Sequence, residues 1–159
     1  MEPIFLSFNY EAIIQLVIAL VLGALIGLER SVAGKTAGMR TFALVSLGST
    51  LFVIISRMLT SSYVGPNDAD SILRVVAAIV SGIGFIGAGL IIFGNQEVKG
   101  LTTAAGLWVS AAIGVAVGMG FYVVSIAGVL LTLFTLRVLY NIEEKAKEYT
   151  HVKDHIHSQ

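Results

Sequence analysis

The chain has 159 residues, of which 56% are apolar and 13% are charged, and its mean hydropathy is +0.88. Soluble domains carry roughly 25% charged residues, so this chain has about half the charge that a water-facing surface needs, which excludes a water-soluble globule. Ten basic and ten acidic side chains balance, so net charge predicts no nucleic-acid partner. The chain has no cysteine, which excludes disulfides and thiolate metal sites.

Apolar runs occur at residues 12–28, 41–55, 75–93, 101–119 and 121–139, and a membrane-spanning helix takes about 20 residues. The charge-free stretch 101–136 is too long for one crossing of the bilayer, and Gly118 and Gly120 mark the predicted break. The sequence therefore predicts an all-α, polytopic membrane helix bundle of about five helices in residues 1–140. Residues 141–159 are predicted to form a short cytoplasmic tail.

The basic residues indicate the orientation of the bundle, because Lys and Arg accumulate on the cytoplasmic side of a membrane. With the N-terminus outside, only Arg57 and Arg74 of the ten basic residues lie outside. No basic residue precedes Arg30, so the basic segment of a cleavable signal peptide is missing and the first run is predicted to be retained. We expect a multi-pass protein of the inner membrane, with its C-terminus in the cytoplasm and the lipid bilayer as its first partner.

Small residues follow a helical spacing in the fourth run, where four of them recur at every fourth position: Gly106, Ser110, Gly114 and Gly118. Such a stripe lets another backbone approach closely, which is how membrane helices commonly pack. The same packing role is predicted for further glycines: Gly23, Gly27, Gly82, Gly84, Gly87 and Gly89. The alternative is that the glycines line a conduction path. Exposed stripes would also favour a homodimer.

Charged residues flank the loop between the first two helices, namely Glu29, Arg30 and Arg40. They serve as topology signals, or Glu29 forms an internal ion pair with an arginine that holds the loop against the bundle.

Asp70 and Arg74 lie four residues apart at the start of the third helix. Asp70 either caps this helix and pairs with Arg74, or joins Asp68 in offering oxygen ligands to a hard cation such as Mg²⁺. The positive charge of Arg74 opposes the metal site.

Several segments occur together in a characteristic order: GALIGLER at 23–30, AGMRT at 37–41, SGIGFIGAG at 81–89 and VKGLTTAA at 98–105, with Asp70, Arg74 and Trp108 between and after them. In this combination the chain resembles the MgtC/SapB family of bacterial and archaeal inner-membrane proteins over residues 10–140. The virulence-factor branch of that family has Asn at the position of Thr102 and Cys at that of Val109, and carries a soluble C-terminal domain. The chain is therefore more similar to the short SapB-like branch.

The resemblance implies a membrane protein linked to survival in low magnesium and, in some members, to acid resistance or persistence in host cells. The best-studied members look like regulators, including of the F-type ATP synthase. The resemblance also implies a set of candidate functional polar residues: Glu29, Arg30, Arg40, Thr41, Asp70, Arg74, Thr102 and Thr103.

We therefore expect a non-enzymatic regulator of Mg²⁺ or proton homeostasis that works through intramembrane contacts with itself or with another inner-membrane protein. The alternative is a small transporter or channel for Mg²⁺ or another ion, which the charged residues at both mouths of the bundle favour. No soluble catalytic domain fits the chain and no nucleophile–base pair lies in the spans, so neither enzymatic activity nor a cofactor is expected.

Overall fold

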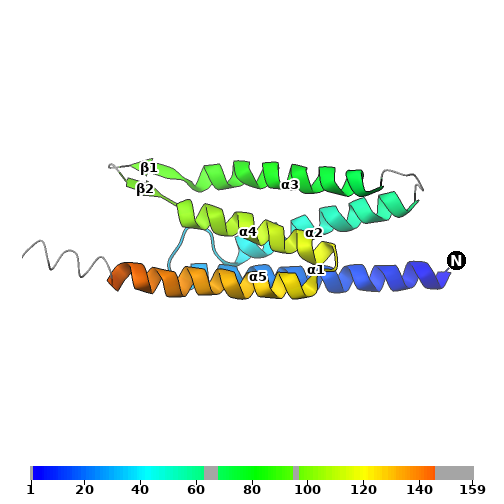
Figure 1. The fold of residues 1–159 in the computed structure, drawn as a ribbon, viewed down its shortest axis with the longest axis horizontal. Helices are drawn as coiled ribbons and strands as arrows, with labels where there is room; N and C mark the ends of the chain where they lie inside the picture. Colours follow the sequence, from blue (N-terminus) through cyan, green and yellow to red (C-terminus); the bar gives the residue numbers. More distant parts are fainter. Residues whose placement is uncertain (1, 63–67, 95–96, 146–159) are drawn as a thin grey trace, which may run out of the picture.

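The structure is a computed structural model that describes the backbone of residues 2–62, 68–94 and 97–145 and the side chains of residues 10–60, 70–93 and 97–145. Its elements in chain order are α1 (Glu2–Val32), α2 (Met39–Ser62), α3 (Asp68–Leu90), β1 (Ile92–Gly94), β2 (Glu97–Lys99), α4 (Leu101–Gly118), α5 (Tyr122–Phe134) and the π-helical turn η1 (Thr135–Leu139). The helices run along one common direction, with the β-hairpin beyond one end of α3 and α4 (Figure 1).

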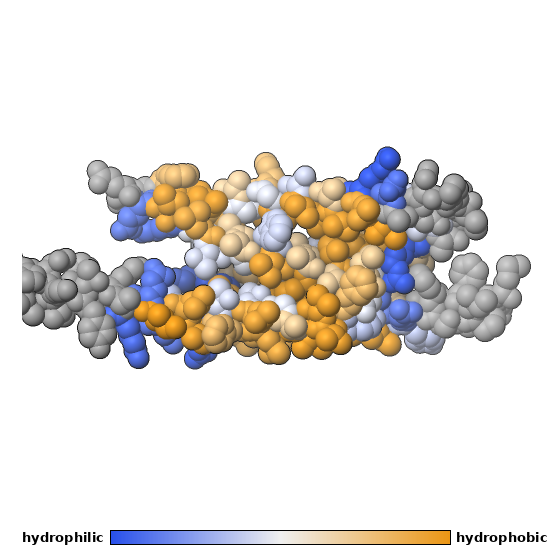
Figure 2. All heavy atoms as spheres, in the orientation of Figure 1, coloured by the Kyte–Doolittle hydropathy of each residue, from blue (hydrophilic) through white to orange (hydrophobic). Residues whose placement is uncertain are grey.

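Five helices are long and apolar enough to cross a membrane, which confirms the predicted helix bundle. Figure 2 shows apolar side chains over the middle of the molecule and hydrophilic ones towards both ends, as a bilayer requires. We define the basic end as the end of the bundle that holds Arg30, Lys35, Arg40, Lys99 and Arg137. The other end is called the opposite end.

Helix α4 is the central element, because it contacts each of the four other helices. Half of the residues in its span are buried, compared with 11% of those in the span of α3. Helices α1 and α2 complete the tightly packed part of the bundle, and α3 and α5 lie at its periphery.

The contact between α2 and α4 is a close approach of two backbones. The four small residues of the α4 stripe are all buried: Gly106, Ser110, Gly114 and Gly118. A Cβ atom on Gly114 would collide with the carbonyl oxygen of Ser46, and one on Gly118 would lie 2.8 Å from the Cβ of Val53. Sequence number rises together along the two helices, so α2 and α4 are parallel.

Two side-chain hydroxyls hold α2 and α4 together. Ser110 Oγ donates a hydrogen bond of 2.9 Å to the carbonyl oxygen of Phe42, and Thr50 Oγ1 donates one of 2.7 Å to that of Gly114. Both hydroxyls are buried. They supply the polar contacts that membrane helices use when lipid removes the hydrophobic drive to associate.

Helix α1 packs antiparallel against α2 through two further glycines. A Cβ on Gly23 would lie 2.6 Å from the carbonyl oxygen of Phe42, and one on Gly27 would lie 2.6 Å from the Cα of Met39. The backbone N–H of Met39 donates a 3.0 Å hydrogen bond to Ser31 Oγ, which fastens the connecting loop. Helices α1, α2 and α4 therefore form one unit with close backbone contacts.

The predicted break between the last two helices is confirmed. Gly120 has a φ of +81°, which suits glycine, and it lies in the short turn between α4 and α5. On α5, three hydroxyls donate to the carbonyl oxygen four residues earlier in their own helix: those of Ser125, Thr132 and Thr135. The helix then continues through η1 to Lys145, into the predicted tail, and residues 146–159 lie outside the described residues.

The apolar run at residues 75–93 is helical only to Leu90, where α3 ends, and a β-hairpin follows. Ile92 pairs with Lys99 and Phe93 with Val98 in antiparallel register. Gly100, at a φ of +92°, ends the hairpin close to the end of α3. A Cβ at Gly100 would collide with the carbonyl oxygen of Leu90. The apolar residues Ile92 and Phe93 could belong to a helix or to a strand. Hydropathy alone cannot distinguish the two, so it does not indicate where α3 ends.

Replacing Gly114 by alanine is expected to lower the free energy of unfolding by about 1–3 kcal/mol, because the added methyl group overpacks the α2–α4 contact. Gly84→Ala is the matched control, since a Cβ at Gly84 has nothing within 4 Å and alanine favours a helix. Unfolding in mixed detergent micelles, followed by circular dichroism, measures both variants. Equal losses of stability would contradict the packing described here.

Candidate functional site

The structure divides the polar candidate residues between the two ends of the bundle. Asp70 and Arg74 lie at the opposite end. The basic end carries the others: Glu29, Arg30, Arg40, Thr41, Thr102 and Thr103. No single site can therefore include all of them.

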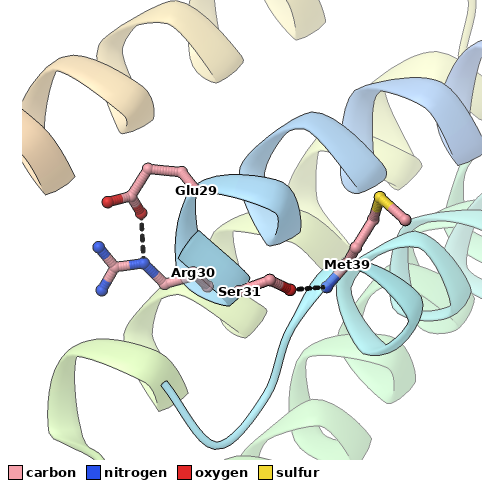
Figure 3. A network of polar contacts seen from close by, with 4 residues as sticks. All are labelled: Glu29, Arg30, Ser31 and Met39. Carbon is pink, nitrogen blue, oxygen red and sulfur yellow. Dashed lines mark hydrogen bonds and ion pairs between the residues drawn. The ribbon is translucent and has the colours of Figure 1, made fainter. Parts of the chain in front are cut away.

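Glu29 and Arg30 form an ion pair at the end of α1. Arg30 Nε donates to Glu29 Oε2 at 2.5 Å, with 4% of the arginine side chain and 13% of the glutamate side chain exposed (Figure 3). The ion pair expected for Glu29 is thus made with its neighbour in the sequence. Arg40, the other arginine of this loop, is exposed.

Arg30 is buried because it continues the inward face of α1, one helical turn after Ile26. A buried charge is costly unless it is paired and hydrogen-bonded. Glu29 satisfies Nε, but within the described part of the chain neither Nη1 nor Nη2 of Arg30 donates a hydrogen bond. The guanidinium is therefore only partly compensated by the protein.

The loop that follows Arg30 leads to the end of the last helix. The backbone N–H of Lys35 donates to the carbonyl oxygen of Arg30 at 3.0 Å, and Lys35 Nζ lies 5.9 Å from the centroid of the Tyr140 ring. Arg137 is exposed within η1, three residues before Tyr140. Single π-helical turns inside helices occur frequently at functional sites. The part of the basic end formed by Lys35, Arg137 and Tyr140 is therefore a candidate functional region.

The start of α4 also lies at the basic end. Thr103 is buried and Thr102 is exposed, so these neighbouring residues face different surroundings, and Thr41 of α2 is partly buried. Ala104 N donates to the carbonyl oxygen of Gly100 at 2.9 Å, which makes it the first residue of α4 whose N–H is bonded within the helix. The preceding N–H groups of the first turn are those that α-helices leave unsatisfied.

At the opposite end, Asp70 and Arg74 are both exposed and form no ion pair with each other. Asp70 lies inside the first turn of α3, which begins at Asp68, so it is not the capping residue. The side chain of Asp68 lies outside the described residues. Among those that are described, no group of three His, Cys, Asp or Glu side chains could hold a metal ion, and the Mg²⁺ site at Asp68 and Asp70 stays a prediction.

Two features of the opposite end have no counterpart in the sequence analysis. Arg57 Nη1 donates a 2.8 Å hydrogen bond to the carbonyl oxygen of Gly118 and so caps the end of α4. An open groove of about 450 Å³ lies between α2 and α3, and its polar lining comes from Ser56, Thr60 and Ser71. The signal for Arg57 was its isolation as a basic residue late in an apolar run.

Comparison with known proteins gives a consistent result. The family model described as the MgtC family matches residues 16–145. The chain is 43% identical over 137 residues to the "Putative magnesium transporter YhiD" of Escherichia coli strain K12, covering 83% of this chain and 62% of that protein. It is 41% identical over 132 residues to "Protein SrpB" of Synechococcus elongatus, covering 77% of this chain and 71% of that protein.

The chain is also 47% identical over 133 residues to "Protein MgtC" of Salmonella typhimurium strain 14028s, covering 84% of this chain and 53% of that protein. The chain thus spans less than two thirds of the length of YhiD and of MgtC. No solved structure matches it.

Glu29→Met is expected to destabilise the bundle by about 1–3 kcal/mol, because it leaves a buried guanidinium without its carboxylate. The double variant Glu29→Met with Arg30→Met should recover much of that loss, since both charged groups are then removed. Unfolding in mixed micelles measures the coupling between the two positions. Additive losses would show that the pair is not energetically coupled.

Proposed function

Because the chain belongs to the MgtC family, we propose that it is a non-enzymatic regulator of Mg²⁺ or proton homeostasis that acts through helix contacts within the inner membrane. The family match over residues 16–145 and the five apolar helices establish a multi-pass membrane protein of this family. The regulatory role rests on one feature of the bundle, the open face of α3.

The glycines of α3 differ from those of α4 in what surrounds them. A Cβ at Gly82, Gly84 or Gly89 would have nothing within 4 Å, and only 11% of the residues in this span are buried. Small residues on a membrane helix permit close approach of another helix. Gly82 and Gly89, seven residues apart, share one side of α3, and Gly84 lies on the opposite side. Both sides therefore have room for a helix supplied by a second copy of the chain or by another inner-membrane protein.

The proposed orientation places the basic end in the cytoplasm. Of the eight Lys and Arg residues that the structure describes, six lie at the basic end and two, Arg57 and Arg74, at the opposite end, as the positive-inside rule requires of cytoplasmic loops. The Glu29–Arg30 pair and the hairpin would then lie on the cytoplasmic side, and Asp70, Arg74 and the groove between α2 and α3 on the outer side.

A transporter of Mg²⁺ or another ion is the second candidate. One relative is named a putative magnesium transporter, and polar side chains lie inside the bundle of this chain. Gln15 donates a 3.2 Å hydrogen bond to the Tyr122 hydroxyl, and Ser46 Oγ is buried with no partner among the described residues. Such groups inside a membrane protein can mark an ion pathway.

The orientation can be tested directly, because the chain has no cysteine. Ser71→Cys and Thr36→Cys each place one thiol at an exposed residue at a different end of the bundle. A membrane-impermeant maleimide should label Ser71→Cys in intact cells and Thr36→Cys only after permeabilisation. The reverse labelling pattern would place the basic end outside.

The regulatory role predicts that a helix contacts α3 in the native membrane. A photo-crosslinking residue at Gly82 or, in a separate variant, at Gly84 should capture a defined partner, and the same residue at exposed Val123 of α5 serves as the control. A cross-linked product of twice the chain mass would identify a second copy as the partner. Absence of any product specific to Gly82 or to Gly84 would remove the contact on which the regulatory proposal rests.

Proteoliposomes distinguish the two candidate functions. The regulatory proposal predicts no Mg²⁺, H⁺ or K⁺ flux above that of vesicles containing the Asp70→Asn or Arg40→Ala variant. A flux that the wild type supports and these variants lose would favour the transporter.

A further inference from the structure

The guanidinium of Arg30 offers more hydrogen-bond donors than its neighbours accept. The side chain is 4% exposed, and its Nε is paired with Glu29. An arginine has five N–H donors, and the four on Nη1 and Nη2 have no acceptor among the residues that the structure describes. A protein rarely leaves this many charged donors unpaired beneath its surface.

These terminal nitrogens are not sealed inside the protein. In the described part of the chain, Ser46 Oγ is the one side-chain polar atom that is both fully inaccessible and without a partner. Nη1 and Nη2 therefore each keep some accessible surface. In Figure 3 the guanidinium points away from Ser31 and Met39, with Glu29 beside it.

Further positive charge lies at the same end of the bundle as Arg30. Lys35 is joined to it by the 3.0 Å backbone hydrogen bond and reaches over the Tyr140 ring, and Arg137 precedes that ring in η1. The ion pairs of the described residues are Glu29–Arg30 and Glu97–Lys99, which leaves Lys35 and Arg137 without a carboxylate there. Of the carboxylates nearby, Glu29 is held by Arg30 and Glu144 accepts from the Tyr140 hydroxyl.

We propose that this corner of the basic end binds a phosphate group, with Nη1 and Nη2 of Arg30 as the paired donors and Lys35 as a second cation. A planar guanidinium matches two oxygens of a phosphate in a bidentate arrangement. Glu29 accepts the hydrogen bond of Arg30 Nε. This contact holds the guanidinium in one orientation and leaves Nη1 and Nη2 to bind the phosphate oxygens. The Glu29–Arg30 pair is thereby a positioning device as well as a stabilising contact.

The phosphate group can come from two sources. One is the headgroup of an anionic phospholipid of the surrounding bilayer, since basic pockets between membrane helices bind such headgroups. The other is free phosphate or a small soluble phosphate compound. The proposal does not depend on the regulatory role, because it concerns binding alone.

The test uses the full chain in nanodiscs of phosphatidylcholine, with and without cardiolipin, and separately with inorganic phosphate added. The midpoint of thermal unfolding and the number of retained lipids in native mass spectrometry are the readouts. One of the two probes should raise the midpoint of the wild type. A response to cardiolipin alone would identify a lipid site, and a response to phosphate alone a soluble ligand.

Variants at the basic end determine whether Arg30 carries the binding. Arg30→Lys keeps the charge but loses the bidentate fork, and should weaken binding of the effective probe about tenfold. Lys35→Ala changes an exposed loop residue and leaves the buried Arg30 side chain intact, so this variant is expected to fold. It should weaken binding of the effective probe about threefold. Arg40→Ala, which removes one positive charge at an exposed arginine of the same end, is the matched control for Lys35→Ala and should bind as the wild type does.

Two results would overturn the proposal. The first is a wild type that neither cardiolipin nor phosphate stabilises. The second is unchanged binding by Arg30→Lys together with equal weakening by Lys35→Ala and Arg40→Ala, which would show that general positive charge accounts for the effect. If Arg30→Lys does not fold, the comparison of Lys35→Ala with Arg40→Ala decides the question, because each removes one positive charge.

Discussion

The close approach of α2 and α4 is the contact on which the rest of the bundle depends. Lipid provides no hydrophobic drive for helices to associate, so the helices need short backbone distances and hydrogen bonds that only small residues and hydroxyls allow. Gly114 and Gly118 supply the short distances, and Ser110 and Thr50 supply the hydrogen bonds. Helix α1 is then positioned against α2, and α3 and α5 are both attached to α4.

This arrangement separates the rigid part of the molecule from the surfaces that are available to other molecules. The tightly packed helices α1, α2 and α4 hold Arg30 in place at the basic end. Helix α3 contributes little to the core and leaves its glycines open. The proposed helix contact and the proposed phosphate site consequently lie on different elements, so one can be removed by mutation while the other is kept.

The sequence predicted the five spans and the short turn at Gly120, because each depends on composition or on spacing along the chain. An ion pair for Glu29 was one of two interpretations that the sequence left open, and the structure shows this pair. The sequence did not predict the hairpin after Leu90, since an apolar run of three residues satisfies a strand as well as a helix. Nor could it distinguish Gly84 from Gly114, which lie in similar sequences. What differs is the neighbour on the next helix, and spacing within one helix carries no information about that neighbour. The partner of Arg57 was missed for the same reason.

Serine and threonine hydroxyls of the spans donate within their own helix, to a neighbouring helix or, at Thr50, to both, with different consequences for the lipid. The hydroxyls of Ser125 and Thr132 on α5 and of Thr135 on η1 donate hydrogen bonds to carbonyl oxygens four residues earlier in the chain. Lipid therefore meets no unsatisfied donor at these three residues. The hydroxyls of Ser110 and Thr50 donate to the neighbouring helix. The mean hydropathy of the chain counts all of these serine and threonine side chains as polar. It therefore underestimates how apolar the surface of α5 is.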